Sequence, residues 1–397
     1  MIASARQSFN KQFTTAKYQF LLDDLNSSYN HKIPFRVAET PLFIAGDFKN
    51  KLLKGAEEII DFIVQPNFSS LMKDAIPQHL SVPNETPHTL FLALDFAVCS
   101  NANGEIVPQL IEMQGFPSLF GYQDLLGNKF KAHYQIDDAW QFHFNKTSNQ
   151  YWAELKKCIV GNHSPEEVVL LEINPYQQNT TIDFLVTQEK LGIHLLHIGD
   201  VIIRERKLFY LYQEKEIQIK RIYNRVIFDE LIQQKDLQTQ FHLTEDVEVE
   251  WAGHPNWFFK ISKYTMPFLN GSAVPESRFL HQVETIPTDL ENYVLKPLFS
   301  FSGSGVIFHV KKEDIENIPV AERKDFLLQR KVHYEPIIQA PDGLVKAEIR
   351  LLYLWPDGKV RPELITNLAR LSRGEMIGVK YNKDKTWVGG TVCFFKN

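Results

Sequence analysis

Two carboxylates and an amide fall on neighbouring segments in the first third of the chain. Asp95 lies in the apolar run Thr89–Val98, and Glu112 and Gln114 lie in a second run that follows a turn at Asn101–Gly104. Side chains at i and i+2 of a strand point to one face, so Glu112 and Gln114 can address one ion together. Magnesium prefers oxygen ligands from one or two carboxylates plus substrate phosphates. The pattern predicts a magnesium site; the alternative is a buried Asp95 paired with a base.

A lysine stands just before a loop rich in serine and glycine in the C-terminal third. Lys296 ends an apolar run, and the loop that follows supplies Ser300, Ser302, Gly303, Ser304 and Gly305. Backbone N–H groups of such a loop can face a phosphate, and the hydroxyls can add donors. Lys263 would supply a second ammonium to neutralise a polyphosphate. The alternatives are an ordinary flexible turn and solvated lysines, since no Gly-Lys-Ser/Thr of a Walker motif ends the loop.

We interpret residues 326–332 as an edge-like strand whose free backbone groups could hydrogen-bond an adenine ring. The candidate nucleotide-binding residues in it are Gln329, Arg330, Lys331 and Val332. Backbone N–H and C=O groups can read a purine whatever the side chains, so side-chain identity carries little information here. The alternative is an amphipathic strand without a ligand.

Two arginines are candidates for catalysis. Arg350 lies in a strand of otherwise mostly apolar residues, Ala347–Leu354, and a charge among such residues needs a partner. That partner is either a phosphoryl group in transfer or Glu348, two residues away on the same face. Arg370 is a second candidate for stabilising charge that develops on a phosphoryl group.

The bulk properties describe an ordinary soluble chain of two or three lobes. It has 397 residues, 44% of them hydrophobic, and a formal net charge of −5, so neither nucleic acid nor a membrane is expected as a partner. Three cysteines lie far apart without a paired motif, which disfavours a disulfide framework or a structural zinc. We expect a cytoplasmic protein, and the sequence gives no indication of its oligomeric state.

The spacing of apolar residues differs along the chain and predicts parts with different secondary structure. Residues 1–85 are predicted to form a mostly helical module. In the stretch that follows residue 145, a strand at 167–173, a helix at 181–191 and a strand at 193–198 predict a parallel α/β unit, and 207–212 with 217–223 predict a hairpin. Several strand-like segments follow from about residue 293. The fold class is therefore expected to be α/β or α+β.

The order of these motifs resembles the ATP-grasp superfamily, specifically its circularly permuted branch, which includes glutathionylspermidine synthetase. In that branch the metal-binding strands precede the nucleotide lobe, as Asp95 and Glu112-Met113-Gln114 precede Val294-Leu295-Lys296-Pro297 here. The late Gly389-Gly390 resembles the closing strand of the family. This chain has Gln114 where the family has Asn, and Ala93 where the family has Arg.

The resemblance spans about residues 90–395, and together with the N-terminal helical module, which lies outside it, it gives a division into four parts. These are an N-terminal helical module (1–85), metal-binding strands of the ATP-grasp lobe (86–145), a Rossmann-like α/β domain that precedes the nucleotide lobe (146–255) and the nucleotide-binding domain (256–397). It also implies ATP and two Mg²⁺ ions as cofactors.

The implied activity is that of an ATP- and Mg²⁺-dependent ligase that joins a small-molecule or peptide carboxylate to an amine through an acyl phosphate. Two alternatives stay open. One is a catalytically degenerate relative that binds nucleotide as a sensor or partner protein, which the changes at Ala93 and Gln114 favour. The other is an α/β binding protein without a nucleotide site.

Overall fold

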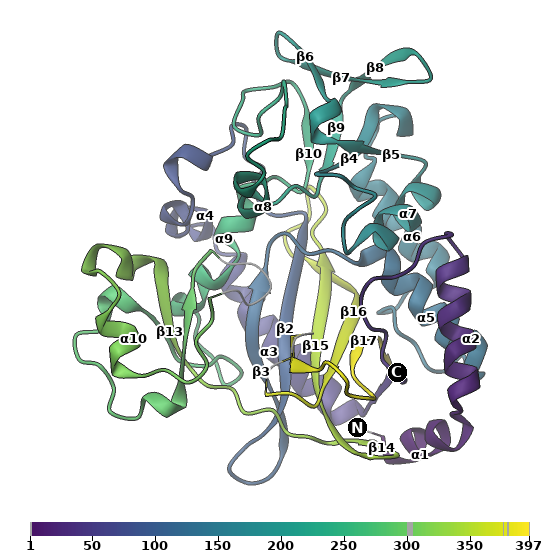
Figure 1. Ribbon diagram of the computed structural model, residues 1–397, viewed down its shortest axis with the longest axis vertical. Coiled ribbons are helices and arrows are strands. Elements are labelled where there is room, and N and C mark those ends of the chain that lie inside the picture. The colour runs from purple at the N-terminus through teal and green to yellow at the C-terminus, as the bar shows by residue number, and fades with distance from the viewer. Residues whose placement is uncertain (1, 300–304, 376, 379–380, 397) are drawn as a thin grey trace.

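A computed structural model describes residues 2–299, 305–375, 377–378 and 381–396 as a mixed α/β molecule with several sheets (Figure 1). At its centre lies a main sheet in which every neighbouring pair is antiparallel. Its strands in spatial order are β17 (Gly389–Thr391), β16 (Glu363–Ser372), β15 (Gly343–Leu354), β2 (Phe91–Ser100) and β3 (Ile106–Gln114). The two runs on either side of the predicted turn at Asn101–Gly104 pair as the antiparallel hairpin of β2 and β3.

Strand β2 is covered on both faces, as its apolar run predicts. Leu92 and Leu94 pack into a core cluster shared with the N-terminal helices, whereas Phe91 and Ala93 pack into a second cluster under the α/β unit. Because successive side chains of a strand point to opposite faces, two covered faces require such an unbroken apolar run. β14 (Ile338–Ala340) extends the sheet as a hairpin with β15.

A second, parallel sheet holds the predicted α/β unit. Its order is β10 (Glu250–Ala252), β9 (Arg221–Asn224), β4 (Val168–Glu172) and β5 (His194–His197). Helix α7 (Thr181–Leu191) connects β4 with β5 and ends at Gly192, so the predicted strand–helix–strand unit is confirmed. Helices α6 (Ser148–Ile159) and α8 (Phe228–Gln233) lie in the same part of the chain.

The hairpin predicted for residues 207–223 is only partly right. β7 (Lys207–Tyr212) pairs with β8 (Lys215–Ile219) and with β6 (Ile202–Arg204) in a small antiparallel sheet. The chain then leaves this sheet at Lys220, and the next residues form β9. All residues of β9 are buried, whereas β8 begins with exposed residues. The two strands therefore belong to different sheets and do not form one hairpin.

A third sheet forms a separate lobe, in green in Figure 1, with α10 (Lys312–Glu316) beside it. Its order is β11 (Ser277–Phe279), β13 (Phe326–Arg330) and β12 (Tyr293–Pro297). The prediction of an edge-like strand at 326–332 is therefore wrong, since β13 is the middle strand and is paired on both sides.

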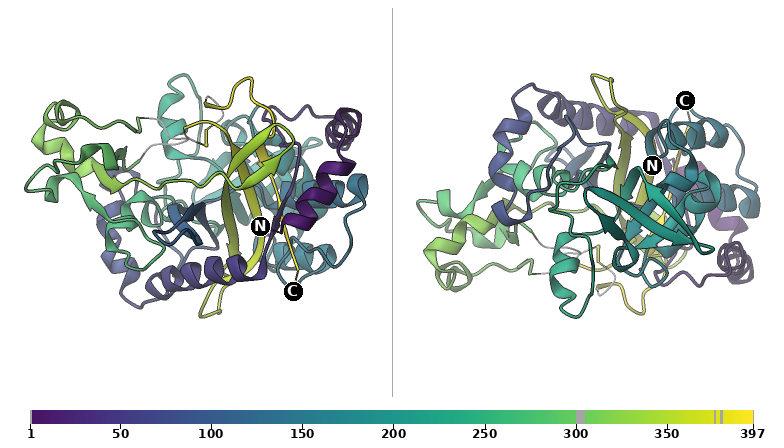
Figure 2. Two further views of the ribbon diagram at one scale, coloured as in Figure 1. Left: turned by 90° about the horizontal axis from the view of Figure 1, so that it is seen from below. Right: turned by 90° about the horizontal axis from the view of Figure 1, so that it is seen from above.

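The N-terminal region is mostly helical, as predicted, and packs on the main sheet. Helices α1 (Ala3–Gln12), α2 (Thr15–Ser27), α3 (Gly46–Ile63) and α4 (Phe68–Leu71) are joined by one short strand, β1 (Leu42–Ile44). β1 pairs in parallel with β18 (Cys393–Phe395), so the two ends of the chain share a sheet. Both views in Figure 2 show α3 along the main sheet. Among the described residues, no helix has the length and apolar character that crossing a bilayer would require.

Candidate functional site

The pairing of strands in the main sheet brings charged residues from distant parts of the chain next to one another. Asp95 on β2 lies directly opposite Glu112 on β3 and opposite Arg350 on β15, and Glu348 on β15 lies opposite Arg370 on β16. Partners that lie opposite one another in a sheet project from the same face. The sheet therefore places three carboxylates and two guanidinium groups beside one another.

Asp95 is fully buried and holds both arginines. Arg350 donates from Nε and Nη2 to the two Asp95 carboxylate oxygens, at 2.6 Å each, and Arg370 Nη2 donates to Asp95 Oδ2 at 2.7 Å. Arg370 also pairs with Glu348, and the Tyr334 hydroxyl donates a hydrogen bond of 2.5 Å to the carboxylate of Glu348. Burial raises the pKa of Asp95 to about 6, and the two arginines oppose that rise because they stabilise the charged carboxylate.

These contacts decide which partner Arg350 has in this structure. The sequence left open a phosphoryl group or Glu348, and the geometry gives Asp95 instead. Both Asp95 oxygens already accept guanidinium protons, and Asp95 is not among the residues that line the neighbouring cleft. Asp95 thus does not fit the role of a direct metal ligand in this arrangement. Over the described ranges, no group of three histidine, cysteine, aspartate or glutamate side chains is placed to hold a metal.

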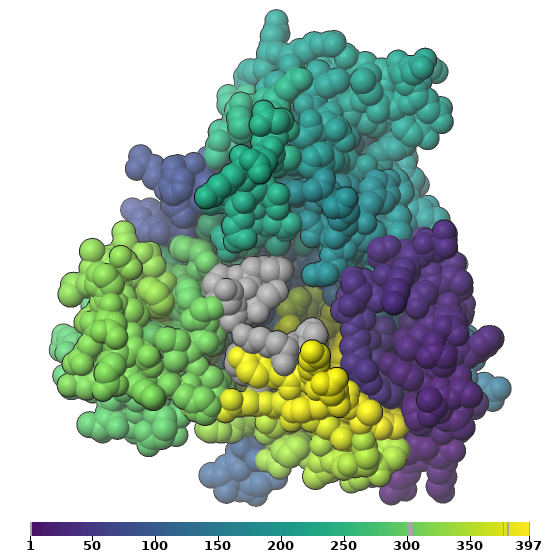
Figure 3. All heavy atoms as spheres, viewed as in Figure 1, coloured from purple at the N-terminus to yellow at the C-terminus, as the bar shows by residue number. Residues whose placement is uncertain are grey.

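A cleft of about 910 Å³, counting the part open to solvent, adjoins this cluster. Its described wall carries one carboxylate, Glu112, and four cationic side chains: Arg225, Lys263, Arg350 and Arg370. Figure 3 shows the green lobe, the teal α/β part and the yellow C-terminal segment facing one another across this side of the molecule. Asp95 and Glu348 behind the wall offset the charges of Arg350 and Arg370, and the remaining cations, Arg225 and Lys263 on the wall, outnumber the one wall carboxylate. This excess of positive charge favours an anionic ligand.

Glu112 lies at the centre of the positive charges. Burial opposes its ionisation, but the cations, Arg370 and Arg350 foremost and then Lys263 and Lys296, hold the pKa of Glu112 below its usual value. Its Oε1 accepts a hydrogen bond of 2.8 Å from the Gln114 amide. Glu112 and Gln114 both line the cleft, so the pair predicted from their i and i+2 spacing is presented to one space.

The two predicted lysines lie beside Glu112. Burial lowers the pKa of Lys296 to about 8, opposed by Glu112, and burial likewise lowers the pKa of Lys263. Lys296 Nζ donates to the backbone oxygen of Ile111 at 3.3 Å, which fixes the lobe against β3. Gly115 allows the Lys263 segment to approach, because a Cβ there would lie 2.4 Å from the Trp257 backbone oxygen. The structure thus brings the early acids and the later lysines together.

The remaining predicted nucleotide contacts differ in where they lie. Gln329 is buried in β13 opposite Val294 and so projects from the same face as Lys296, and neither atom of its amide has a partner within the described chain. Arg330 projects the other way, stacks on Tyr293 and pairs with Asp289 at 2.6 Å.

Lys331 packs over the Phe308 ring, and Val332 follows it, half-buried. Ser300, Ser302, Gly303 and Ser304 lie outside the described residues, and Gly305 begins the next described stretch.

Sequence reasoning missed Arg225. It follows β9 and reaches from the α/β unit into the cleft, where it stacks on Phe116 at 4.5 Å and donates to the Pro117 backbone oxygen. Its Nε is buried and has no partner within the described residues. The only local signal is a charged residue directly after a buried strand of a parallel sheet, where ligand-binding residues tend to lie.

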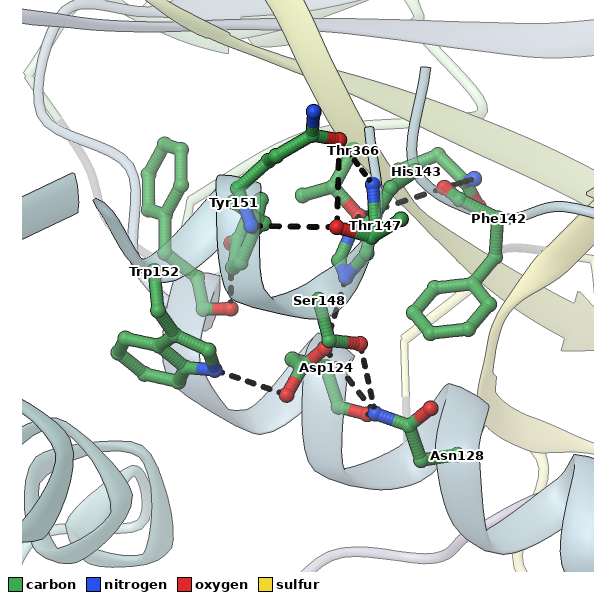
Figure 4. A network of polar contacts seen from close by, with 12 residues as sticks. Asp124, Asn128, Phe142, His143, Thr147, Ser148, Tyr151, Trp152 and Thr366 are labelled. Atoms are coloured by element: carbon green, nitrogen blue, oxygen red, sulfur yellow. Dashed lines mark hydrogen bonds and ion pairs between the residues drawn. The ribbon is translucent and has the colours of Figure 1, made fainter. Parts of the chain in front are cut away.

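A second polar network lies away from the cleft (Figure 4). His143 Nε2 lies 2.8 Å from Asp124 Oδ1, and His143 Nδ1 lies 3.0 Å from the Thr366 hydroxyl. Acid, histidine and hydroxyl are the groups of a nucleophilic triad, but Thr366 is 0% exposed and His143 only 3%. Trp152 also donates to Asp124. The network ties α5 (Phe120–Tyr134), α6 and β16 together and has no access to a substrate.

Comparison with protein-family models gives no match, and comparison with curated proteins gives none either. Among solved structures, a glutathione synthetase-like effector from Globodera pallida, determined in its apo form, superposes with a TM-score of 0.59. The alignment covers 97% of this chain and 98% of that chain at 9% sequence identity. The two proteins share a fold from end to end. At this identity, the likeness carries no information about activity or substrate.

Proposed function

We propose that this protein is an ATP-dependent carboxylate–amine ligase with a circularly permuted ATP-grasp arrangement. The observation that carries the proposal is the gathering of Glu112, Lys263 and the arginine pair around one positively charged cleft, with Lys296 close to Glu112. These residues come from segments far apart in the sequence, and their order along the chain is the order that the family resemblance requires. The end-to-end likeness to a glutathione synthetase-like structure supports the fold component of the proposal.

Each group has a task that follows from its position. Lys263 and Lys296 neutralise phosphate oxygens, and an anion brought to Lys296 favours its charged form, which burial now disfavours. Arg350 and Arg370 stand where the phosphoryl group would pass to the substrate carboxylate, and they stabilise the charge that develops there. The resulting acyl phosphate loses phosphate when an amine attacks its carbonyl carbon.

Asp95 is assigned a positioning task. Its two oxygens fix both guanidinium planes, so the arginines need no reorganisation when the anion arrives. Glu112 and Gln114 present oxygen atoms to the cleft and are the residues that would hold Mg²⁺, which would neutralise charge shared by the phosphates. The unpartnered Gln329 amide is suited to hydrogen-bond the base, on the same sheet face as Lys296.

The first experiment measures nucleotide binding and turnover separately. Mg·ATP at about 100 times its dissociation constant should stabilise the protein by roughly 2.7 kcal/mol. Lys296→Met should abolish most of that stabilisation, since it removes the half-buried cation beside Glu112 while keeping a side chain of similar length. Lys312→Met is the matched control, because Lys312 is exposed at the surface of the same lobe. Equal stabilisation of both variants by Mg·ATP would contradict the proposed nucleotide site.

Turnover then distinguishes the ligase from its alternative. ATP consumption that depends on both a carboxylate and an amine, measured as ADP and phosphate release, is the expected result. A protein that binds nucleotide without turnover is the second candidate, favoured by the full engagement of Asp95 with arginines and by Ala93 and Gln114. Tight Mg·ATP binding with no ADP release across a broad panel of acids and amines would decide for that candidate.

A further inference from the structure

A second cavity of about 1260 Å³, counting the part open to solvent, shares the arginine pair with the cationic cleft. Arg350 and Arg370 line both spaces, and the turn after β3 separates them: Ser118 faces the cleft and Leu119 the second cavity. Leu119 has φ +73°, a conformation unusual for a leucine, and Asp183 accepts its backbone N–H at 2.9 Å. Any group placed between the arginines is therefore reachable from both sides.

The walls of the second cavity are mainly apolar, in contrast to the cleft. They come from β16, the start of α5, the segment before β1 and the C-terminal segment, and the apolar side chains are Phe35, Leu119, Leu368, Leu371, Ile377 and Val388. Such walls favour an apolar ligand body, because burial of apolar surface is the main gain when a ligand enters a pocket.

Three polar atoms at this cavity have no partner within the described chain. They are the Tyr122 hydroxyl, Gln123 Oε1 and Arg370 Nε. Tyr122 and Gln123 are each 1% exposed, and buried polar groups in proteins are almost always hydrogen-bonded. An unpartnered guanidinium N–H favours an anionic oxygen, and the hydroxyl and the amide favour a second polar group on the same ligand.

We propose that this second cavity binds the carboxylate substrate, and that this substrate is an acid with an aliphatic or aromatic body. The inference rests on the proposed ligase function for its chemistry. The carboxylate lies at the arginine pair, the apolar body lies between β16 and α5, and a polar group such as an α-amino group meets Tyr122 and Gln123. Arg36, Lys383 and Asp384 also line the cavity, so the preference for an apolar body comes from the apolar side chains of the wall and not from a lack of charged groups.

Binding is tested without turnover, by calorimetry with four small probes, in the absence and presence of Mg²⁺ and a non-hydrolysable ATP analogue. L-Phenylalanine and 3-phenylpropionate keep the acid and the apolar body, phenethylamine lacks the acid, and L-glutamate lacks the apolar body. The first two should bind, and the last two should bind at least about 10-fold more weakly, the discrimination that a missing charged or apolar contact produces. Equal or tighter binding of phenethylamine, or no binding of any probe in either state, would overturn the inference.

Two variants separate a binding task from a structural one. Tyr122→Phe and Gln123→Met remove unpartnered polar atoms at nearly constant shape, so the thermal stability of the free protein should stay level or rise. The affinity for L-phenylalanine should fall about 3- to 10-fold in each, the effect of one lost hydrogen bond. Tyr134→Phe is the control, because its hydroxyl is also buried and unpartnered on α5 but lies outside the cavity. Lower stability with unchanged affinity in the two test variants would overturn the inference.

The same data keep this inference apart from the ligase proposal. If L-phenylalanine binds and no acid–amine pair consumes ATP, the cavity assignment stands and the ligase proposal fails. If ATP is consumed with other acids while neither apolar acid binds, the ligase proposal stands and the cavity assignment fails.

Discussion

Asp95 shows how one buried acid can organise a site. It accepts three hydrogen bonds from two guanidinium groups and is 0% exposed. Its value lies in fixing Arg350 and Arg370, each of which lines both the cleft and the second cavity. The sequence identified all three residues as functional candidates but could not assign the pairing, because the alternation of a strand gives the face of a side chain and not its partner.

Replacement of Asp95 by asparagine tests whether Asp95 holds the two arginines in place. Asp95→Asn leaves the buried Arg350 and the half-buried Arg370 without their shared negative charge, and removal of one partner of a buried pair costs about 3–5 kcal/mol. Asp61→Asn is the control, since the Arg361–Asp61 pair lies at the surface and should lose less than about 1 kcal/mol. The free energies of unfolding from urea titration should differ accordingly, and equal losses would mean that Asp95 is dispensable to the cluster.

Strand β4 of the parallel sheet ends in a buried acid that the site does not use directly. Glu172 Oε1 accepts the Ile173 N–H at 2.7 Å, and burial raises the pKa of Glu172 to about 8, with Glu230 adding to the shift and Arg225 opposing it. A folded-state pKa above the unfolded value means that the folded state binds more protons. The stabilising effect of the protonated acid is complete below the unfolded pKa and is lost as the pH rises through about 8.

Glu172→Gln should remove this dependence while keeping the acceptor oxygen. Between about pH 5 and pH 8 the wild type should lose stability relative to the variant, by roughly 1.4 kcal/mol for each unit of pKa difference at most. Chemical denaturation at several pH values gives the difference, and the exposed Glu291→Gln serves as control with no trend. A difference independent of pH would show that Glu172 is not protonated in the folded state.

Gly389 and Gly390 on β17 allow the segment before β1 to pack against this strand. The Gly390 N–H donates to the Arg36 oxygen, and the Ala38 N–H donates to the Gly390 oxygen, so the segment before β1 lies directly on β17. At Gly389, with φ +125°, a Cβ would lie 2.4 Å from the Arg36 backbone oxygen. No side chain fits there without a shift of the backbone.

Gly389→Ala should therefore destabilise the protein by more than backbone strain alone, by about 2 kcal/mol or more. Gly343→Ala is the matched control, because Gly343 has φ +132° and nothing lies within 4 Å of its added Cβ. Denaturation midpoints of the two variants measure the difference. Equal destabilisation would show that conformation, and not the approach of Arg36, requires glycine at 389.

At the scale of the whole molecule, the N-terminal helices belong to the same core as the central sheet. Phe9, Leu21 and Leu25 pack in one cluster with Ile349 of β15 and Phe394 of β18. The pairing of β1 with β18 adds backbone hydrogen bonds between the two ends of the chain. The N-terminal region thus completes the face of the main sheet opposite the α/β unit.

Removal of residues 2–40 should therefore abolish cooperative folding of the whole chain and not only lower its stability. The deletion exposes β17 and the apolar face beneath α1 and α2, so we expect loss of the single thermal transition and aggregation. Substitution of Gln213-Glu214 by Asn-Gly, in the exposed turn between β7 and β8, is the control and should melt like the wild type. A truncated chain that melts cooperatively would show that the N-terminal helices are an independent addition.

The sequence by itself determined the local elements and the classes of charged residues. The apolar run of β2, the unit from β4 to β5 and the common face of Glu112 and Gln114 follow from periodicity, which records how each segment is buried. The tertiary structure alone decided the pairing of Asp95 with two arginines, the entry of Arg225 into the cleft and the cavity behind the arginine pair. Those features depend on strand register and on contacts between segments hundreds of residues apart, and no local pattern encodes them.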